Sequence, residues 1–370
     1  MNASKIALFL QDLSGGGAER MMVNLAGGLA ALGIPVDLVL VREEGPLLTR
    51  VPSSVRIVPL GTRRVLYSIP ALARYLRRER PVAMLTTLVH VNLAALVARR
   101  LSGVSTRLIV REANYVSINR TKIDFAPVRL AYQLIPWVYP WADRIIAVSQ
   151  GVTEDLLKCS GLPRDRVVVL PNPVVTPELT AKAAEPVDHA WLVEGQPPVV
   201  LGVGRLVPQK DFATLIRAFA VVHGRRRARL VILGEGPVRL ALEHQVRDLG
   251  LEADVALPGF ANNPYAWMVR ASVFVLSSAW EGSPNVLVEA MACGTPVVAT
   301  DCPSGSREIL MDGKFGTLVP VGDVTAMAEA IFTTLDHPPG PGLARQRAEA
   351  FAVDRVVGQY LRVLLGEKPV

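Results

Sequence analysis

The chain has 370 residues, of which half are hydrophobic and a fifth are charged. That length suits two domains, and that composition excludes intrinsic disorder because it provides enough apolar surface for packed cores. The three cysteines, Cys159, Cys293 and Cys302, form no CxxC pair, which excludes a disulfide framework and a cysteine-based zinc site and favours a reducing, cytoplasmic setting. We expect neither a signal peptide nor a membrane span, since no uncharged apolar run reaches about 18 residues.

The net charge of +7 is unevenly distributed along the chain. Residues 1–180 hold 22 Lys and Arg against 13 Asp and Glu, whereas residues 181–370 hold 18 against 20. A basic half suggests an anionic partner such as a nucleic acid, an anionic membrane or a phosphorylated acceptor. Nucleic acid is the least expected of these, because no known nucleic-acid-binding module is present.

Short β-branched runs alternate with helical patterns in the first half of the chain. The predicted strands are Ile6–Gln11, Val36–Val41, Val55–Val58, Val82–Thr86, Leu108–Arg111, Arg144–Val148 and Val167–Leu170. The helical patterns between them include Ala18–Leu32, Leu66–Glu79 and Leu93–Leu101. Strands that are apolar at successive positions are typical of a parallel sheet covered on both faces, so this half is predicted to be a doubly wound α/β domain.

The alternation stops between Pro171 and Pro198, a stretch rich in Pro, Ala and acidic residues, and then resumes. The second series of predicted strands is Val199–Val203, Leu230–Leu233, Val255–Leu257, Val273–Leu276 and Val297–Thr300, with helices such as Phe212–His223 and Val238–Leu249. We therefore predict two Rossmann-like domains, 1–180 and 181–349. A final helical region, Leu343–Leu365, follows, and its part from about 350 to 370 is expected to pack back on the first domain.

Three glycines, Gly15, Gly16 and Gly17, separate the first strand from the first helix. Glycines there let the backbone approach a ligand closely, and the helix N-terminus attracts a negative group. The same glycines would also serve as a flexible turn with no ligand. Their spacing differs from GxGxxG, which argues against a nicotinamide dehydrogenase.

The second domain opens with a glycine turn and two cations, in GVGRLVPQKD from Gly202 to Asp211. Arg205 and Lys210 would neutralise two phosphates, Arg through a bidentate fork and Lys as a point charge. Alternatively, both are solvated loop cations. Asp211 is predicted to cap the following helix.

The stretch from Ser278 to Pro296 is the most informative. Ser283 is predicted as a helix N-cap with Pro284 at the first helical position, so that the amides of Asn285 and Val286 face an anion or sugar hydroxyls.

Two carboxylates accompany that helix. Glu289 lies inside it among apolar residues and requires a partner, because burying an unpaired carboxylate is costly. Glu281 precedes the N-terminus, and Gly294 is predicted to end the helix. The alternative is an ordinary strand–helix unit with two surface glutamates.

This stretch, EGSPNVLVEAMACGTPVVATDCPSGSREIL, resembles the nucleotide-sugar motif of the retaining GT-B enzymes of glycosyltransferase family 4. The hallmark of that family, two Glu separated by seven residues, is matched by Glu281 and Glu289. GRLVPQKDF and GGGAER resemble the family as well, and the resemblance covers nearly the whole chain. It implies a GT-B fold with a nucleotide sugar in an interdomain cleft, and neither a metal nor another cofactor.

The resemblance also implies residue roles. Arg205 and Lys210 would bind the donor diphosphate, Glu289 the ribose hydroxyls, and Glu281 the transferred sugar. The remaining donor-binding positions it implies are Gly16, Gly17, Gly204, Phe260, Ala261, Ser283, Pro284, Asn285 and Val286, with Pro258–Ala261 along the base. Transfer would retain configuration, with the leaving phosphate as base.

One departure concerns acceptor-side chemistry. Many family members carry a His in the first domain, but the segment after the fifth strand reads Arg111-Glu112-Ala113-Asn114. His90 is a possible substitute catalytic residue, or simply a residue at a helix start. The resemblance favours transfer of a UDP-linked hexose or N-acetylhexosamine to a glycan or polyprenyl-diphosphate-linked acceptor. A binding protein without transfer activity, or an epimerase of this fold, is the alternative.

Two basic stretches in the first domain also carry apolar residues. Arg63–Arg80 places Leu66, Ile69, Leu72 and Leu76 at near-helical spacing, and a second stretch runs from Arg120 through Lys122 and Arg129 to Trp137, Tyr139 and Trp141. Such side chains suit an anionic membrane surface. They equally suit ordinary amphipathic helices packed on the sheet. The first reading predicts a peripheral protein on the inner face of the plasma membrane.

Overall fold

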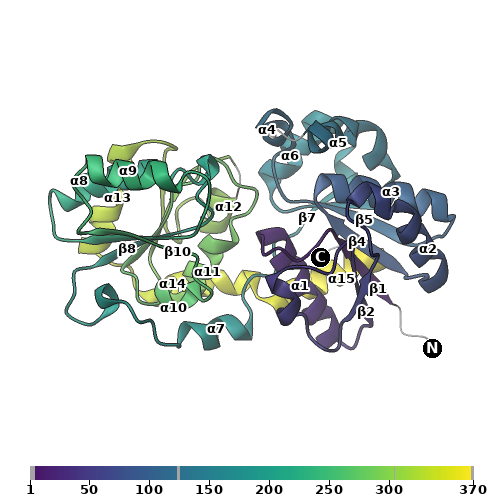
Figure 1. Ribbon diagram of the computed structural model, residues 1–370, viewed down its shortest axis with the longest axis horizontal. Coiled ribbons are helices and arrows are strands. Elements are labelled where there is room, and N and C mark those ends of the chain that lie inside the picture. Colours follow the sequence, from purple (N-terminus) through teal and green to yellow (C-terminus); the bar gives the residue numbers. More distant parts are fainter. Residues whose placement is uncertain (1–4, 123–125, 304, 368–370) are drawn as a thin grey trace. The chain divides into compact units, whose positions relative to one another are not determined.

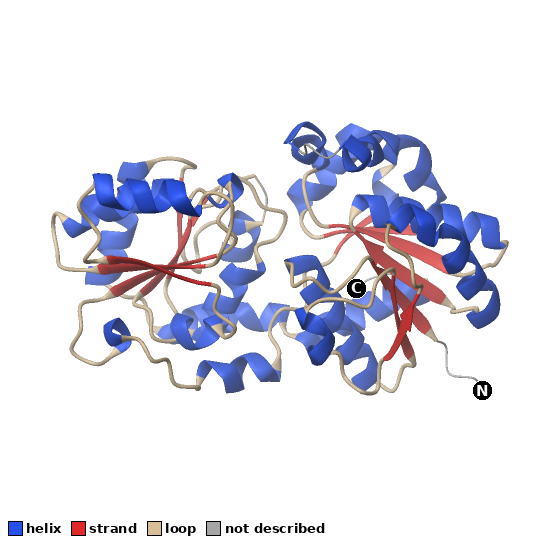
Figure 2. Cartoon of the chain, viewed as in Figure 1, coloured by secondary structure: helices blue, strands red, loops and turns tan. Residues whose placement is uncertain are grey.

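The computed structural model describes residues 5–122, 126–303 and 305–367. The chain forms two compact units, one made of Met1–Pro173 with Val353–Val370 and the other of Val174–Ala352. Each unit is a parallel sheet with helices on both faces, which is the doubly wound architecture that the sequence predicts (Figures 1 and 2).

The sheet of the first unit has the order β3-β2-β1-β4-β5-β6-β7. Its strands are β1 (Ile6–Leu10), β2 (Val36–Leu40), β3 (Arg56–Pro59), β4 (Ala83–Thr87), β5 (Arg107–Glu112), β6 (Arg144–Ala147) and β7 (Val167–Val169). Ile6 of β1 lies opposite Val36 on one side and Ala83 on the other, in parallel register. Every residue of β1, β2 and β4 is buried, as expected for strands covered on both faces.

Helices cover the two faces of this sheet in separate sets. They are α1 (Gly17–Ala31), α2 (Ile69–Glu79), α3 (Val89–Ser102), α4 (Val116–Lys122), α5 (Ala126–Val138), α6 (Gln150–Ser160) and α15 (Val353–Leu365). Leu25 of α1 and Tyr360 of α15 belong to the core on one face. Leu72 of α2, Leu96 of α3 and Ile135 of α5 belong to the core on the other.

The sheet of the second unit has the order β10-β9-β8-β11-β12-β13. Its strands are β8 (Val199–Val203), β9 (Arg229–Leu233), β10 (Val255–Gly259), β11 (Val273–Leu276), β12 (Val297–Thr300) and β13 (Thr317–Val319). Its helices are α7 (Pro177–Ala183), α8 (Phe212–His223), α9 (Arg239–Asp248), α10 (Pro264–Met268), α11 (Asn285–Cys293), α12 (Ser306–Leu310), α13 (Val324–Asp336) and α14 (Pro341–Ala348). Residues of α8, α9 and α13 form the core on one face, and residues of α10, α11 and α14 form it on the other.

The structure changes two predicted boundaries. The first unit ends at Pro173 instead of residue 180, because Val174 and Leu179 pack into the core of the second unit. The single helical region expected over Leu343–Leu365 is two helices, α14 in the second unit and α15 in the first, separated by the 3-10 turn Glu349–Phe351 and the extended Ala352.

Two further results complete the fold. The short strand β13 was not predicted, because it has only three residues and follows a glycine-rich turn. Over the described ranges, no helix combines the length and apolar character needed to cross a membrane.

The close contact between α1 and α15 requires a residue without a Cβ atom at position 28, which is Gly28. A Cβ built there would lie 2.4 Å from Cγ2 of Val357 and 2.8 Å from Cγ1 of Val353. The two helices lie side by side in Figure 1. Gly28 therefore sets how closely α15 can pack.

We predict that Gly28→Ala destabilises the first unit by about 1–3 kcal/mol, since the buried valines must shift. Gly358→Ala is the matched control on α15, where an added Cβ meets nothing within 4 Å. That change should stabilise the helix by up to about 1 kcal/mol, because Ala has the higher helix propensity. Urea unfolding of both variants measures the difference, and equal midpoints would contradict the predicted clash.

Candidate functional site

The carboxyl edge of the second sheet contains a point where the strand order reverses. β8 lies between β9 and β11, so the chain leaves β8 toward one side of the sheet and later returns to its other side. Ligands of open α/β sheets bind at such points, because the loops after the two central strands diverge. Here those loops are 204–211 and 277–284.

Three hydrogen bonds hold the two loops together. The amide of Ala279 donates to the carbonyl of Gln209 at 2.8 Å, and Nε2 of Gln209 donates to the carbonyl of Trp280 at 2.9 Å. Oγ of Ser277 donates to the carbonyl of Lys210 at 2.7 Å. The turn that carries Lys210 is therefore fixed to the loop that carries Glu281.

Lys210 and Glu281 form an ion pair within this group of loops. Nζ of Lys210 lies 2.5 Å from Oε1 of Glu281, which also accepts a hydrogen bond from Oγ of Ser278 at 2.7 Å. Only 7% of Glu281 is exposed. A nearly buried carboxylate requires such partners, so this arrangement is a stable place for two opposite charges.

Arg205 and Gly204 lie on the same loop as Lys210. Arg205 is exposed and makes no ion pair with any residue in the described ranges, so the structure does not bring it to Glu281. A Cβ at Gly204 would lie 3.2 Å from Cε of Lys210, so the glycine leaves room for the lysine side chain. The amide of Gly204 donates to the carbonyl of Leu233, which ties the loop to β9.

Helix α11 begins one residue later than the sequence suggests. Ser283 is not its N-cap, because the extended ψ of 97° makes Pro284 the capping residue and Asn285 the first helical one. The amide of Leu287 donates to the carbonyl of Pro284. The C-terminus agrees with the prediction, since Gly294 has a φ of 83° in the left-handed region.

Glu289 lies on the second turn of α11 and is only 3% exposed. The hydroxyl of Tyr265, on α10, lies 3.3 Å from Oε1 of Glu289. The sequence predicts that this carboxylate has a hydrogen-bonding partner. Tyr265 is one such partner, and the sequence analysis did not identify it. No motif marked it, because Tyr265 reaches Glu289 only through the packing of α10 on α11.

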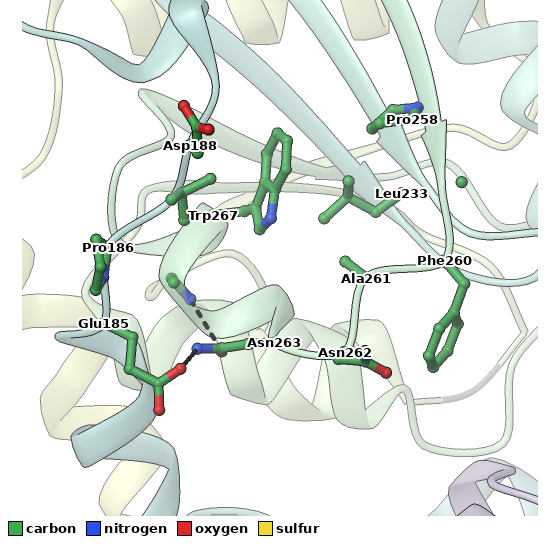
Figure 3. Close-up of a pocket in the computed structure, with 13 residues that line it drawn as sticks. Glu185, Pro186, Asp188, Leu233, Pro258, Phe260, Ala261, Asn262, Asn263 and Trp267 are labelled. Atoms are coloured by element: carbon green, nitrogen blue, oxygen red, sulfur yellow. Dashed lines mark hydrogen bonds between the residues drawn. The ribbon is translucent and has the colours of Figure 1, made fainter.

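A cavity of about 300 Å³ adjoins α10 (Figure 3). Phe260 and Ala261, after β10, line it together with Trp267 of α10 and Asp188. Asn263 anchors the wall beside them by donating to Oε2 of Glu185 at 2.7 Å. Phe260 and Ala261 were predicted from the resemblance, whereas Glu185 and Asp188 belong to a stretch that the sequence marked only as a connection.

The first unit has its own reversal of strand order, between β1 and β4. The glycine loop follows β1, with Gly15 at a φ of 99°, Gly16 as the N-cap of α1 and Gly17 as its first residue. Their predicted contact with a donor stays a prediction. His90 lies in the first turn of α3, and its Nε2 is 3.0 Å from Oε1 of Gln11. Burial lowers the pKa of His90, so the imidazole is neutral near pH 7.

Arg111 and Glu112, at the end of β5, are both buried. Burial raises the pKa of Glu112 to about 7, while the hydroxyl of Tyr139 donates to its Oε2 at 2.7 Å. Nδ2 of Asn92 donates in turn to that hydroxyl at 2.9 Å. This network gives the buried carboxyl group at the end of β5 a hydrogen-bond partner.

The two basic stretches are partly core and partly surface. Leu72 and Leu76 are buried in the core because α2 packs this side on the sheet, which agrees with the second of the two interpretations for these two residues. Tyr139 is also buried, and its hydroxyl donates a hydrogen bond to Glu112. Leu66 remains 70% exposed beside Tyr67.

The second stretch presents its apolar surface on α5. Leu130, Leu134 and Trp137 are exposed there beside Arg129. Trp141 instead lies under the guanidinium of Arg100, at 4.6 Å. The side chain of Lys122 lies outside the described residues.

Comparison with known families decides the class of protein. Residues 15–177 match the family model described as Glycosyltransferase Family 4, and residues 197–337 match the model described as Glycosyl transferases group 1. The chain belongs to glycosyltransferase family 4. The first match covers β2 to β7 and the second covers β8 to β13, so both units of this glycosyltransferase are those of a GT-B enzyme.

Relatives and solved structures agree with that assignment. The Campylobacter jejuni N-acetylgalactosamine-N,N'-diacetylbacillosaminyl-diphospho-undecaprenol 4-alpha-N-acetylgalactosaminyltransferase is 33% identical, over 98% of this chain and 100% of that relative. The lipopolysaccharide core biosynthesis glycosyltransferase LpsE of Rhizobium meliloti is 29% identical, over 96% and 97%. The Anabaena protein HepE, solved with UDP-glucose, has a TM-score of 0.77 at 20% identity, covering 97% of this chain and 99% of its own.

We predict that Lys210→Met in this glycosyltransferase destabilises the second unit by about 1.5–3 kcal/mol, because Glu281 loses a charged hydrogen bond. The double variant with Glu281→Gln should lose less than the sum of the single losses, which reports the coupling between the two side chains. Exposed Lys314→Met is the control and should change stability by less than about 0.5 kcal/mol. Strict additivity in urea unfolding would rule out the pair.

Proposed function

We propose that this glycosyltransferase moves a hexose or N-acetylhexosamine from a UDP-linked donor to a glycan or polyprenyl-diphosphate-linked acceptor, with retention, in surface polysaccharide biosynthesis. The observation that carries the proposal is the Lys210–Glu281 pair at the reversal of strand order, beside the N-terminus of α11. The activities named for the C. jejuni and R. meliloti relatives support the proposed acceptor and the proposed role in polysaccharide biosynthesis. The UDP-glucose bound to HepE supports the donor.

The donor diphosphate is assigned to Arg205 and Lys210. An ammonium has three N–H donors, so Lys210 has further donors for a phosphate while it holds Glu281. Arg205, exposed on the same loop, offers a bidentate fork. Two cations and the first-turn amides of α11 provide positive charge for the leaving diphosphate, and we propose that the reaction needs no metal.

The rest of the donor is assigned along α11 and the loop after β10. Glu289, whose hydroxyl partner Tyr265 shows that it accepts O–H donors, is proposed to bind the ribose hydroxyls. Glu281 would face the transferred sugar, where a carboxylate stabilises oxocarbenium-like charge. Ser283, Pro284, Asn285 and Val286 would surround the sugar and phosphate, and Phe260 and Ala261 the base.

A binding experiment tests this assignment. We predict that Glu289→Gln weakens UDP binding at least tenfold in calorimetry, because a charged hydrogen bond to ribose contributes about 1.5–3 kcal/mol. Glu252→Gln, exposed on the same unit, should bind UDP like the unchanged protein. Equal affinity in the Glu289 variant would remove it from the ribose role.

A screen of nucleotide sugars then separates the candidate activities. Transfer of the sugar to a polyprenyl-diphosphate-linked glycan with retained configuration is the expected result. Binding with neither transfer nor donor hydrolysis would indicate a non-catalytic protein, and an isomerised sugar nucleotide formed without an acceptor would indicate an epimerase.

We also propose that the first unit of this cytoplasmic enzyme contacts an anionic membrane. Arg74, Arg77 and Arg78 are exposed on α2, Leu66 and Tyr67 are exposed on the turn that leads into this helix, and the outer side of α5 adds a second apolar surface. Each cation near an anionic leaflet contributes about 1 kcal/mol, and a polyprenyl diphosphate presents its phosphates at the same level.

Charge reversal tests the membrane contact. Replacing Arg74, Arg77 and Arg78 by Glu should release the protein from vesicles containing phosphatidylglycerol, as measured by co-sedimentation at low salt, because attraction becomes repulsion. Reversal of Arg227, Arg247 and Lys314, three exposed cations of the second unit, is the control for net charge and should leave binding nearly intact. Equal loss in both variants would show that only overall charge matters.

A further inference from the structure

Two side chains bridge the reversal of strand order in the first unit. Gln11 directly follows β1, and His90 lies in the first turn of the helix that follows β4. Oε1 of Gln11 and Nε2 of His90 are 3.0 Å apart. Neither Gln11 nor its neighbour Asp12 belongs to any motif singled out in the sequence.

Asp12 determines which way the Gln11 amide points. Its carboxylate is buried and accepts hydrogen bonds from the amide and Oγ of Ser14, at 3.2 and 2.7 Å, and from Arg42. Burial raises the pKa of Asp12, but the hydrogen bonds from Ser14, Arg42 and Gln11 together outweigh it and hold the pKa below its usual value. Asp12 is therefore ionised at neutral pH and only accepts hydrogen bonds.

The ionised carboxylate of Asp12 determines the donor and the acceptor in the hydrogen bonds that follow. Nε2 of Gln11 must face Asp12, at 3.1 Å, since a flipped amide would place two acceptors together. Oε1 of Gln11 then faces His90, and because an amide oxygen only accepts, Nε2 of His90 must carry the proton. The neutral imidazole has one proton, so its Nδ1 is left as an acceptor.

Within the part of the chain that the structure describes, no group forms a hydrogen bond with Nδ1 of His90. This nitrogen is also not buried. It therefore offers a lone pair to solvent at the carboxyl edge of the sheet, where doubly wound folds bind ligands. A neutral acceptor nitrogen suits an O–H donor and disfavours a phosphate oxygen, which is itself an acceptor.

We propose that Asp12 and Gln11 are positioning residues that hold His90 in its Nε2–H tautomer, so that Nδ1 accepts a hydrogen bond from a sugar hydroxyl during transfer. This inference rests on the proposed function for its ligand, but the tautomer itself does not. Asp12 acts on Gln11, Gln11 acts on His90, and only His90 meets the hydroxyl. Arg42 balances the charge of Asp12.

The tautomer is measured directly on the full chain by ¹⁵N-histidine labelling and long-range ¹H–¹⁵N correlation, with His90 assigned by loss of its signals in His90→Gln. The unchanged protein should show a protonated Nε2 and an unprotonated Nδ1 in His90. Gln11→Met, which keeps the size of the side chain and removes both hydrogen bonds, should convert His90 to a mixture of tautomers. A protonated Nδ1 in the unchanged protein, or an unchanged spectrum in Gln11→Met, would overturn the inference.

Turnover measures the second half of the inference. Gln11→Met should lower kcat at least tenfold with little change in donor KM, His90→Gln should lower it by at least as much, and the double variant should lose no more than His90→Gln alone. Gln245→Met is the matched control, since Gln245 donates one side-chain hydrogen bond to the carbonyl of Ala213 far from β1 in sequence, and it should retain full kcat.

The possible failures are distinguishable. Additive losses in kcat, or normal kcat in Gln11→Met, would refute the positioning role although the enzyme transfers sugar. Absence of any transfer by the unchanged protein, with UDP binding and the tautomer intact, would instead refute the proposed function.

Discussion

The reversal of strand order at β1 and at β8 is the constraint on which the rest of this protein depends. In a parallel sheet all strands end at one edge, and the loops after the two strands at the reversal lead away to opposite sides. Side chains carried by these loops, and by the helices that follow them, can therefore face one another and a ligand. In each unit one such pair is in hydrogen-bond contact.

The two pairs differ in charge, and under the proposed function this difference would divide the chemistry between the units. Lys210 and Glu281 are a cation and an anion, suited to a substrate part that carries or develops charge. Gln11 and His90 are both neutral, suited to the recognition of a hydroxyl. Both pairs need outside support, which Ser278 gives to Glu281 and Asp12 gives to Gln11, because buried polar groups are stable only when their hydrogen bonds are complete.

The sequence was sufficient for the features that depend on local pattern. Apolar runs predicted the strands, and Gly294 and Asp211 predicted a helix end and a helix start, because each of these depends on neighbouring residues alone. The resemblance singled out Lys210 and Glu281 as donor-binding residues, but the ion pair between them came from the structure. What could not be predicted depends on packing between distant segments: Tyr265 against Glu289, Gln11 against His90, and Tyr139 against Glu112. The prediction of Ser283 as the N-cap was wrong by one residue, because the extended ψ angle of Pro284 places the start of the helix at Asn285.

The return of the chain to the first unit through α15 has a consequence for how the protein is made. Val356, Val357, Tyr360, Val363 and Leu364 complete a core whose other buried members lie before residue 171. A ribosome releases these residues only after the whole second unit has emerged. The domain synthesised first is thus the last to be finished, and until then it exposes the apolar side of α1. Nascent chains of this enzyme need protection from aggregation until α15 has been made, and a truncation that removes α15 would damage the first unit although it lies in a distant part of the sequence.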